Sequence, residues 1–158
     1  MSFADLLHNK PVLVGLHLAF AIVGIDFFLW LMGEFIANPE KRSRIKFVSI
    51  MGLLGFVLSW LAGGYYYVKY YGTLVKPVIL AGSADWAHKI AMEAKEHIFL
   101  FIIPMAMTLV FLAFLDKETL NNSRLKGPAI TLIGVMVSLA LAIGAMGYII
   151  SAAARWAL

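Results

Sequence analysis

The sequence alternates long apolar runs with short polar segments, and four of the runs are close to the length that crosses a bilayer. They cover residues 12–36, 45–68, 98–115 and 129–154. Pro11 precedes the first run and Pro128 the fourth, as is common at the first turn of a helix. Residues 84–97 predict an amphipathic helix that leads into the third run. The pattern predicts an all-α, integral membrane four-helix bundle that forms one domain over residues 1–158.

Composition supports this class and narrows the chemistry. Hydrophobic residues make up 62% of the chain and charged residues 14%, which is typical of polytopic membrane proteins. The chain has no cysteine, which excludes c-type haem attachment, iron–sulfur clusters, disulfides and thiol catalysis. The net charge of +4 lies beside the apolar runs, so it favours membrane lipids over nucleic acid as a partner.

Basic residues between the runs predict the orientation. The segments 37–46 and 116–128 share one face of the bundle. That face carries seven basic residues: Lys41, Arg42, Arg44, Lys46, Lys117, Arg124 and Lys126. The other face carries six, spread over more chain: Lys10, Lys69, Lys76, Lys89, Lys95 and Arg155. The positive-inside rule then places both termini outside. The N-terminus lacks the pattern of a signal peptide, and we expect a bacterial or archaeal inner (plasma) membrane location.

Two histidines stand out because intramembrane ionisable residues usually serve function. His17 lies six residues after Pro11, about 9 Å along its helix, and His97 enters at a similar depth from the same face. Glu93 precedes His97 by one turn, and a carboxylate there could orient an imidazole that binds a metal. His88 points to the other side of the same helix. The pattern predicts ligation by His17 and His97, with Glu93 behind His97.

Haem b is the first cofactor to consider, because two axial histidines on facing helices suit low-spin haem iron. Ala21 and Gly24 continue the stripe of His17 and are small enough to let a porphyrin lie against the helix. Cations on the outer face could bind the propionates: Lys10, Lys69, Lys89, Lys95 and Arg155.

A non-haem copper, zinc or iron ion is the main alternative cofactor. His17, His97 and Glu93 would bind it, with His88 or Asp85 as a further ligand. Those two residues reach such a site only if the lead-in helix breaks. A third reading is a cofactor-free accessory subunit whose histidines only form hydrogen bonds.

Three segments together resemble a group of known proteins. They are VGLHLAFAIVGIDFF, LSWLAGGYYY and DWAHKIAMEAKEHIFLF. The chain resembles the small four-helix membrane proteins related to the copper-resistance protein D and HemJ-type protoporphyrinogen oxidase families. The resemblance implies haem b, and it carries over to His17, Lys95 and His97 only. It implies no particular enzymatic activity.

Small residues form a ridge on the second run and another on the fourth. The ridges are Gly52, Gly55, Ser59 and Gly63, then Ala140, Gly144, Gly147 and Ser151. Such ridges indicate close helix approach, or room for a flat macrocycle, and both can hold at different points of one ridge.

Asp26 lies near the middle of the first run, on nearly the opposite side from His17. It could be a protonated donor to a hydroxyl of Ser59, Thr108 or Ser138, or a station for proton or quinone chemistry. Five tyrosines crowd the outer end of the second run and indicate an interfacial aromatic belt or a surface for a quinone or partner: Tyr65, Tyr66, Tyr67, Tyr70 and Tyr71.

Together these features predict a b-type cytochrome-like subunit. It would carry electrons between a quinol, or another lipid-soluble donor, and a redox partner at the outer face. A chain of this size with no evident soluble domain would work with other membrane or redox protein subunits rather than as a complete enzyme.

Overall fold

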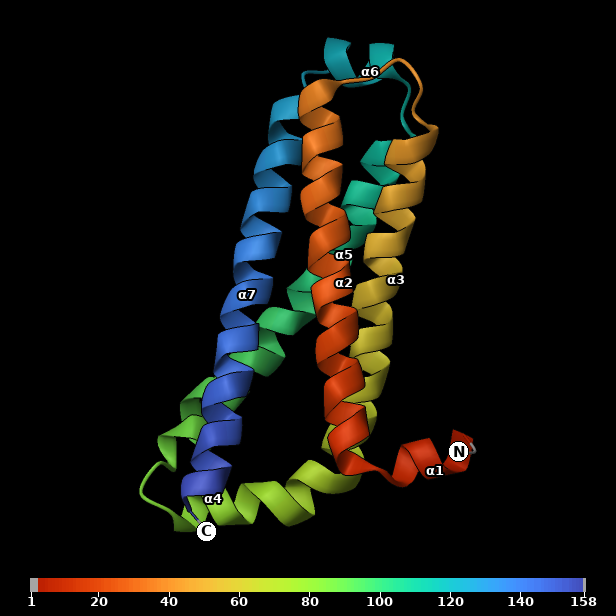
Figure 1. Cartoon of the computed structure of the whole chain (residues 1–158). Coiled ribbons are helices and arrows are strands. Elements are labelled where there is room, and N and C mark those ends of the chain that lie inside the picture. Colours follow the sequence, from red (N-terminus) through yellow and green to blue (C-terminus); the bar gives the residue numbers. More distant parts are fainter. Residues whose placement is uncertain (1–2, 158) are drawn as a thin grey trace.

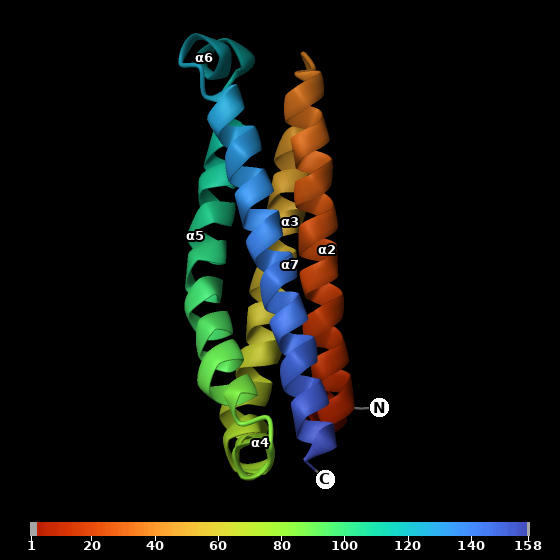
Figure 2. The same cartoon turned by 90° about the vertical axis from the view of Figure 1, so that its left-hand side faces the viewer.

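The computed structural model describes residues 3–157, and all regular secondary structure in that range is helical. Four helical segments long and apolar enough to cross a membrane lie side by side in an elongated bundle (Figures 1 and 2). They are α2 (Lys10–Ala37), α3 (Ser43–Tyr66), α5 (Glu93–Phe114) with the preceding π-helix η2 (Ala87–Met92), and α7 (Lys126–Trp156). The predicted all-α architecture, with four helical segments long and apolar enough to cross a membrane, is confirmed.

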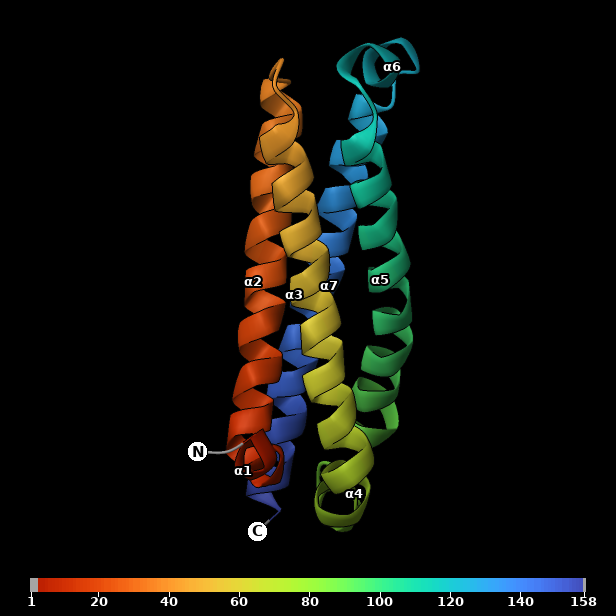
Figure 3. The same cartoon turned by 90° about the vertical axis from the view of Figure 1, so that its right-hand side faces the viewer.

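Two short helices lie at opposite ends of this bundle. Helix α1 (Phe3–His8) precedes α2, and α6 (Lys117–Asn122) connects α5 to α7. Both ends of the chain lie at the end opposite α6 (Figures 1 and 3). The chain therefore begins and ends at the same end of the bundle, and the membrane side of that end stays a prediction from the charge pattern.

Local sequence signals explain where α2 begins and ends. The Asn9 side chain accepts a hydrogen bond from the backbone N–H of Val12 at 3.3 Å, and Pro11 lies in the first turn. At the other end Asn38 adopts the left-handed conformation, with φ 49°, and its backbone N–H donates to the Glu34 carbonyl. Asparagine tolerates this conformation better than most residues, so it closes the helix before Pro39.

The segment after α3 runs across the end of the bundle. The π-helix η1 (Tyr67–Val75) and α4 (Lys76–Ala81) lie crosswise in Figure 1 and are seen end-on in Figures 2 and 3. Tyr71 and Ile79 from this segment are buried in one cluster with Ile150 and Ala153 of α7. Residues 69–94, which the sequence predicts to be a long loop, are therefore mostly helical, and η1 and α4 pack across this end of the bundle. The predicted lead-in helix begins at Ala87 rather than at residue 84.

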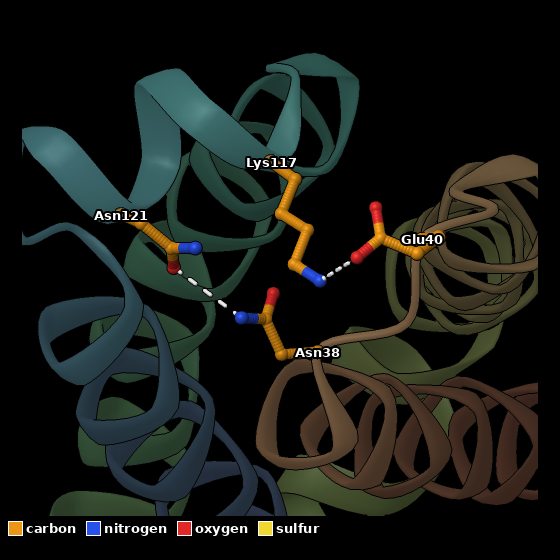
Figure 4. Close-up of polar contacts among 4 residues, drawn as sticks. All are labelled: Asn38, Glu40, Lys117 and Asn121. Atoms are coloured by element: carbon orange, nitrogen blue, oxygen red, sulfur yellow. Dashed lines mark hydrogen bonds and ion pairs between the residues drawn. The ribbon is translucent and has the colours of Figure 1, made fainter.

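At the other end, polar contacts join the two inter-helix loops (Figure 4). The Lys117 ammonium pairs with the Glu40 carboxylate, and the Asn38 side-chain amide donates to the Asn121 oxygen at 3.4 Å. Asp116 caps α6 and accepts from both the backbone and the side chain of Thr119, which lowers the pKa of Asp116. These contacts hold the α2–α3 loop against the α5–α7 connection.

Glycines let α2 and α3 pack closely along most of their length. A Cβ atom added at Gly55 would lie only 2.7 Å from the backbone nitrogen of Gly24. The Phe28 ring covers Gly52 and the Phe56 ring covers Gly24, and the two rings stack with centroids 5.5 Å apart. Close approach, one of the two predicted roles of this ridge, is confirmed at these positions.

Replacing Gly55 by alanine should destabilise the bundle, because the new methyl group meets backbone that cannot rotate away. We expect the free energy of unfolding of Gly55→Ala to fall by about 1–3 kcal/mol. Gly134→Ala is the matched control, because a Cβ atom there meets nothing within 4 Å and gains the same helix propensity. Reversible unfolding in mixed detergent micelles measures both variants. Equal stability of the two would show that the predicted contact does not limit packing.

Candidate functional site

A cavity of about 560 Å³ lies between the helices at the end of the bundle that carries the termini. This volume is typical of pockets for small molecules and cofactors. Helices α2, α3, α5 and α7 contribute its walls, and η1, α4 and η2 complete it. Trp60 and Leu100 line the cavity and are also exposed on the outside of the bundle, so the cavity reaches the apolar outer surface.

The lining is mainly apolar and aromatic, with a few polar groups. Aromatic side chains are Trp60, Tyr66, Tyr67, Tyr71 and Phe99. Small residues are Gly63, Gly64, Gly147, Ser151 and Ala154. The ionisable or basic groups other than the tyrosines are His17, Lys95, Glu96 and Arg155. Flat apolar walls with a few convergent polar groups are typical of a cofactor site.

His17 is held rigidly by Ser59 of α3. Its Nδ1 lies 2.9 Å from the carbonyl oxygen of Ser59 and 2.9 Å from the Ser59 hydroxyl oxygen. The Ser59 hydroxyl donates to the carbonyl of His17 at 2.8 Å. A carbonyl oxygen only accepts hydrogen bonds, so Nδ1 must carry the proton. The neutral ring therefore has a free lone pair on Nε2, the form in which histidine binds a metal.

Gly63 makes room for the ring. A Cβ atom added there would lie 2.5 Å from Nδ1 of His17, so any side chain would displace the imidazole. The ridge on α3 thus has two functions along its length. Gly52 and Gly55 let the helices touch, and Gly63 accommodates the His17 ring beside the cavity.

Lys95 faces His17 from α5. The two side chains line the same cavity and interact electrostatically. A Cβ atom added at Gly147 of α7 would lie 3.4 Å from the Lys95 ammonium nitrogen, so the glycine leaves space for this long side chain. The cavity therefore brings together two of the three residues carried over by the family resemblance.

His97 is the third of these residues, and it does not line the cavity. It is exposed, and its Nδ1 lies 2.6 Å from the backbone carbonyl of Glu93 rather than from the Glu93 carboxylate. Glu93 and His97 do share a helix face, as the spacing predicts. That face points away from the bundle, because the inward stripe of this helix runs through Met92, Lys95 and Phe99. The structure does not bring His17 and His97 together across the cavity.

The other predicted site residues lie elsewhere. The Phe56 ring covers Gly24, and neither Gly24 nor Ala21 lines the cavity. The buried His88 lies with its Nδ1 3.0 Å from the Tyr71 hydroxyl, behind the cavity wall. The Lys89 ammonium hydrogen-bonds to the Asp85 carboxylate and lowers the pKa of Asp85. Within residues 3–157 no three His, Cys, Asp or Glu side chains gather as a metal site.

Asp26 is exposed on the outer side of α2 and does not reach the predicted hydroxyl partners. Those three hydroxyls donate instead to backbone carbonyls: Ser59 to His17, Thr108 to Pro104, and Ser138 to Gly134. Asp26 is therefore remote from the cavity.

Glu96 is a polar group of the cavity that the sequence did not single out. Its Oε1 atom is buried and has no hydrogen-bond partner within the described chain. The Tyr67 phenol interacts with the same carboxyl group, and the Tyr67 ring stacks on Tyr71 with centroids 5.2 Å apart. The only sequence signal was its position beside Lys95, in the polar stretch 93–97 that precedes the third apolar run.

Comparison with known proteins gives no function for this cavity. No family model matches the sequence, and neither a curated protein nor a solved structure matches the chain.

Proposed function

We propose that the protein is a membrane-embedded b-type haem protein that carries electrons from a quinol, or another lipid-soluble donor, to a redox partner. The observation that carries the proposal is the fixed tautomer of His17 at the wall of an apolar cavity. The ring presents Nε2 as a ligand without further rearrangement. A haem bound there would supply one-electron redox chemistry.

The cavity has the other groups that a haem requires. Glycines and aromatic side chains form walls against which a flat ring can lie, as at Gly64 and Tyr66. Lys95 lines the same cavity, and its side-chain nitrogen would hold the haem iron together with His17. Arg155 lines the same cavity and would bind a propionate. This assignment replaces the His17–His97 pair expected from spacing.

Glu96 is placed to accept a proton when a quinol donor is oxidised. A quinol becomes a quinone in two steps, each of which releases one electron and one proton, and the redox partner would take the first electron from the haem before the second arrives. The buried Oε1 of Glu96 has no hydrogen-bond partner in the described chain and can accept one of these protons. The opening beside Leu100 and Trp60 faces lipid, where such a donor dissolves.

Variants of the three candidate ligands test the haem assignment. We expect His17→Ala to lose stoichiometric haem, because no second histidine lines the cavity within residues 3–157. Lys95→Leu should keep the haem but convert a low-spin spectrum to a high-spin one, because leucine offers no atom that binds iron, and His97→Ala should retain the wild-type spectrum. Absorption spectra of oxidised and dithionite-reduced purified protein, with iron analysis, measure all three. Loss of haem in His97→Ala with retention in His17→Ala would contradict the assignment.

The support that Ser59 gives His17 can be tested separately. Removing the hydroxyl leaves the backbone carbonyl as the acceptor but frees the ring to turn. Ser59→Ala should therefore weaken haem affinity by about 10- to 100-fold. Ser49→Ala is the control, because Ser49 is also buried on α3 and donates to the Lys46 carbonyl of its own helix. Haem titration into apoprotein gives both affinities, and equal weakening would mean that Ser59 acts only through stability.

The proton-accepting role predicts that Glu96→Gln keeps its haem but reacts slowly with a quinol. We expect reduction by a short-chain ubiquinol to slow on the order of 10²-fold, whereas reduction by dithionite is unchanged. Stopped-flow absorption measures both rates. Unchanged reduction by ubiquinol would remove Glu96 from the proposed proton path.

A further inference from the structure

Asp26 is a carboxyl group near mid-membrane that the proposed haem site does not use. It lies on the exposed side of α2, and no hydrogen bond or ion pair reaches it within residues 3–157. A carboxyl group that faces only lipid is costly unless another polar group meets it. Its partner must therefore come from outside this chain.

The residues around Asp26 form a regular seam on the same side of α2. They follow one another at alternating spacings of four and three: Gly15, Ala19, Ile22, Asp26, Leu29, Gly33 and Ile36. All seven are exposed. This is the heptad spacing of two helices in a left-handed coiled coil. The seam runs about 30 Å along the helix, nearly the whole hydrocarbon thickness.

The seam has the small residues that a close helix contact needs. A Cβ atom added at Gly15 or at Gly33 would meet nothing within 4 Å, so both glycines are open to the outside. They contrast with Gly24 on the inner side, which the Phe56 ring covers. We compared the most apolar 18-residue stretch of each of the four segments. The fraction of buried residues in this stretch is smallest in α2, at 17%. Its outer side is thus the least covered spanning surface of the bundle.

We infer that this seam is the interface of a parallel homodimer in which the Asp26 side chains of two copies hydrogen-bond to each other. Two copies with one membrane topology, related by a two-fold axis along the membrane normal, place Asp26 opposite Asp26 at equal depth. A neutral carboxyl group both donates and accepts, so it complements itself, whereas lysine and arginine only donate. One polar residue within an apolar heptad seam also fixes the register of a helix pair.

The dimer would leave both haem cavities free. Asp26 follows His17 by nine residues, which turns it to nearly the opposite side of α2. The inference is therefore independent of what the cavity binds.

Because the chain has no cysteine, a single introduced cysteine reports contact between copies directly. Ile36→Cys lies on the seam, within one turn of the helix end and close to water. Phe111→Cys is the control, since it is equally apolar, 69% exposed, and within one turn of the end of α5 at the same end of the bundle. Both are made in the full chain and cross-linked in native membranes with a short bis-maleimide. We expect a covalent dimer with Ile36→Cys and little with Phe111→Cys.

Substitution of Asp26 in the Ile36→Cys background tests the pairing of carboxyl groups. Asparagine complements itself in the same way, so Asp26→Asn should keep the cross-link. Asp26→Leu should weaken dimerisation about 3- to 30-fold, measured as the dependence of cross-linking on dilution with lipid. Cross-linking of Ile36→Cys to a different protein, or no more of it than in the control, would overturn the homodimer. Equal dimerisation of the asparagine and leucine variants would overturn the role of Asp26.

Discussion

The hydrogen bonds between His17 and Ser59 are the interaction on which the proposed site depends. They join α2 to α3, and through the carbonyl of Ser59 they leave Nε2 of His17 as the only ring nitrogen with a free lone pair. They also require Gly63, because any side chain there would occupy the position of the ring. A contact that stabilises the helix pair thus also prepares a ligand, so packing and chemistry cannot be altered independently at this point.

The small residues divide the bundle into two parts. Where Gly24, Gly52 and Gly55 meet, helix backbone and phenylalanine rings are in close contact. Further along, small residues of α3 and α7 line the cavity, and residues of η1 and α4 close it at the end of the bundle. The π-helical turns of η1 and η2 lie at this cavity, and such turns are frequent at functional sites. The cavity therefore lies beyond the part of the bundle in which α2 and α3 pack closely through their glycines.

Hydropathy predicted the helices well because membrane spans are defined by length and apolarity, which are local properties. It could not show which side of a helix faces inward, because lipid and protein interior are equally apolar. The stripe through Glu93 and His97 was identified correctly, yet it faces outward, and the inward stripe contains Lys95 and Glu96. The small residues of α3, Gly52, Gly55 and Gly63, indicated more reliably which side of a helix faces the interior. The crosswise helices η1 and α4 were missed because their polar residues and tyrosines resemble those of a loop.

Pulsed electron paramagnetic resonance of the ferric protein labelled with ¹⁵N-histidine tests the central claim most directly. It detects the magnetic coupling between the haem iron and each ligating histidine nitrogen. We expect coupling to the ring of one histidine only, because in the proposed site Lys95 would supply the other nitrogen and would stay unlabelled. Coupling to two histidine rings would show that a second histidine reaches the iron and that the cavity is not the haem site. A protein with haem iron but no coupled histidine would contradict the role of His17.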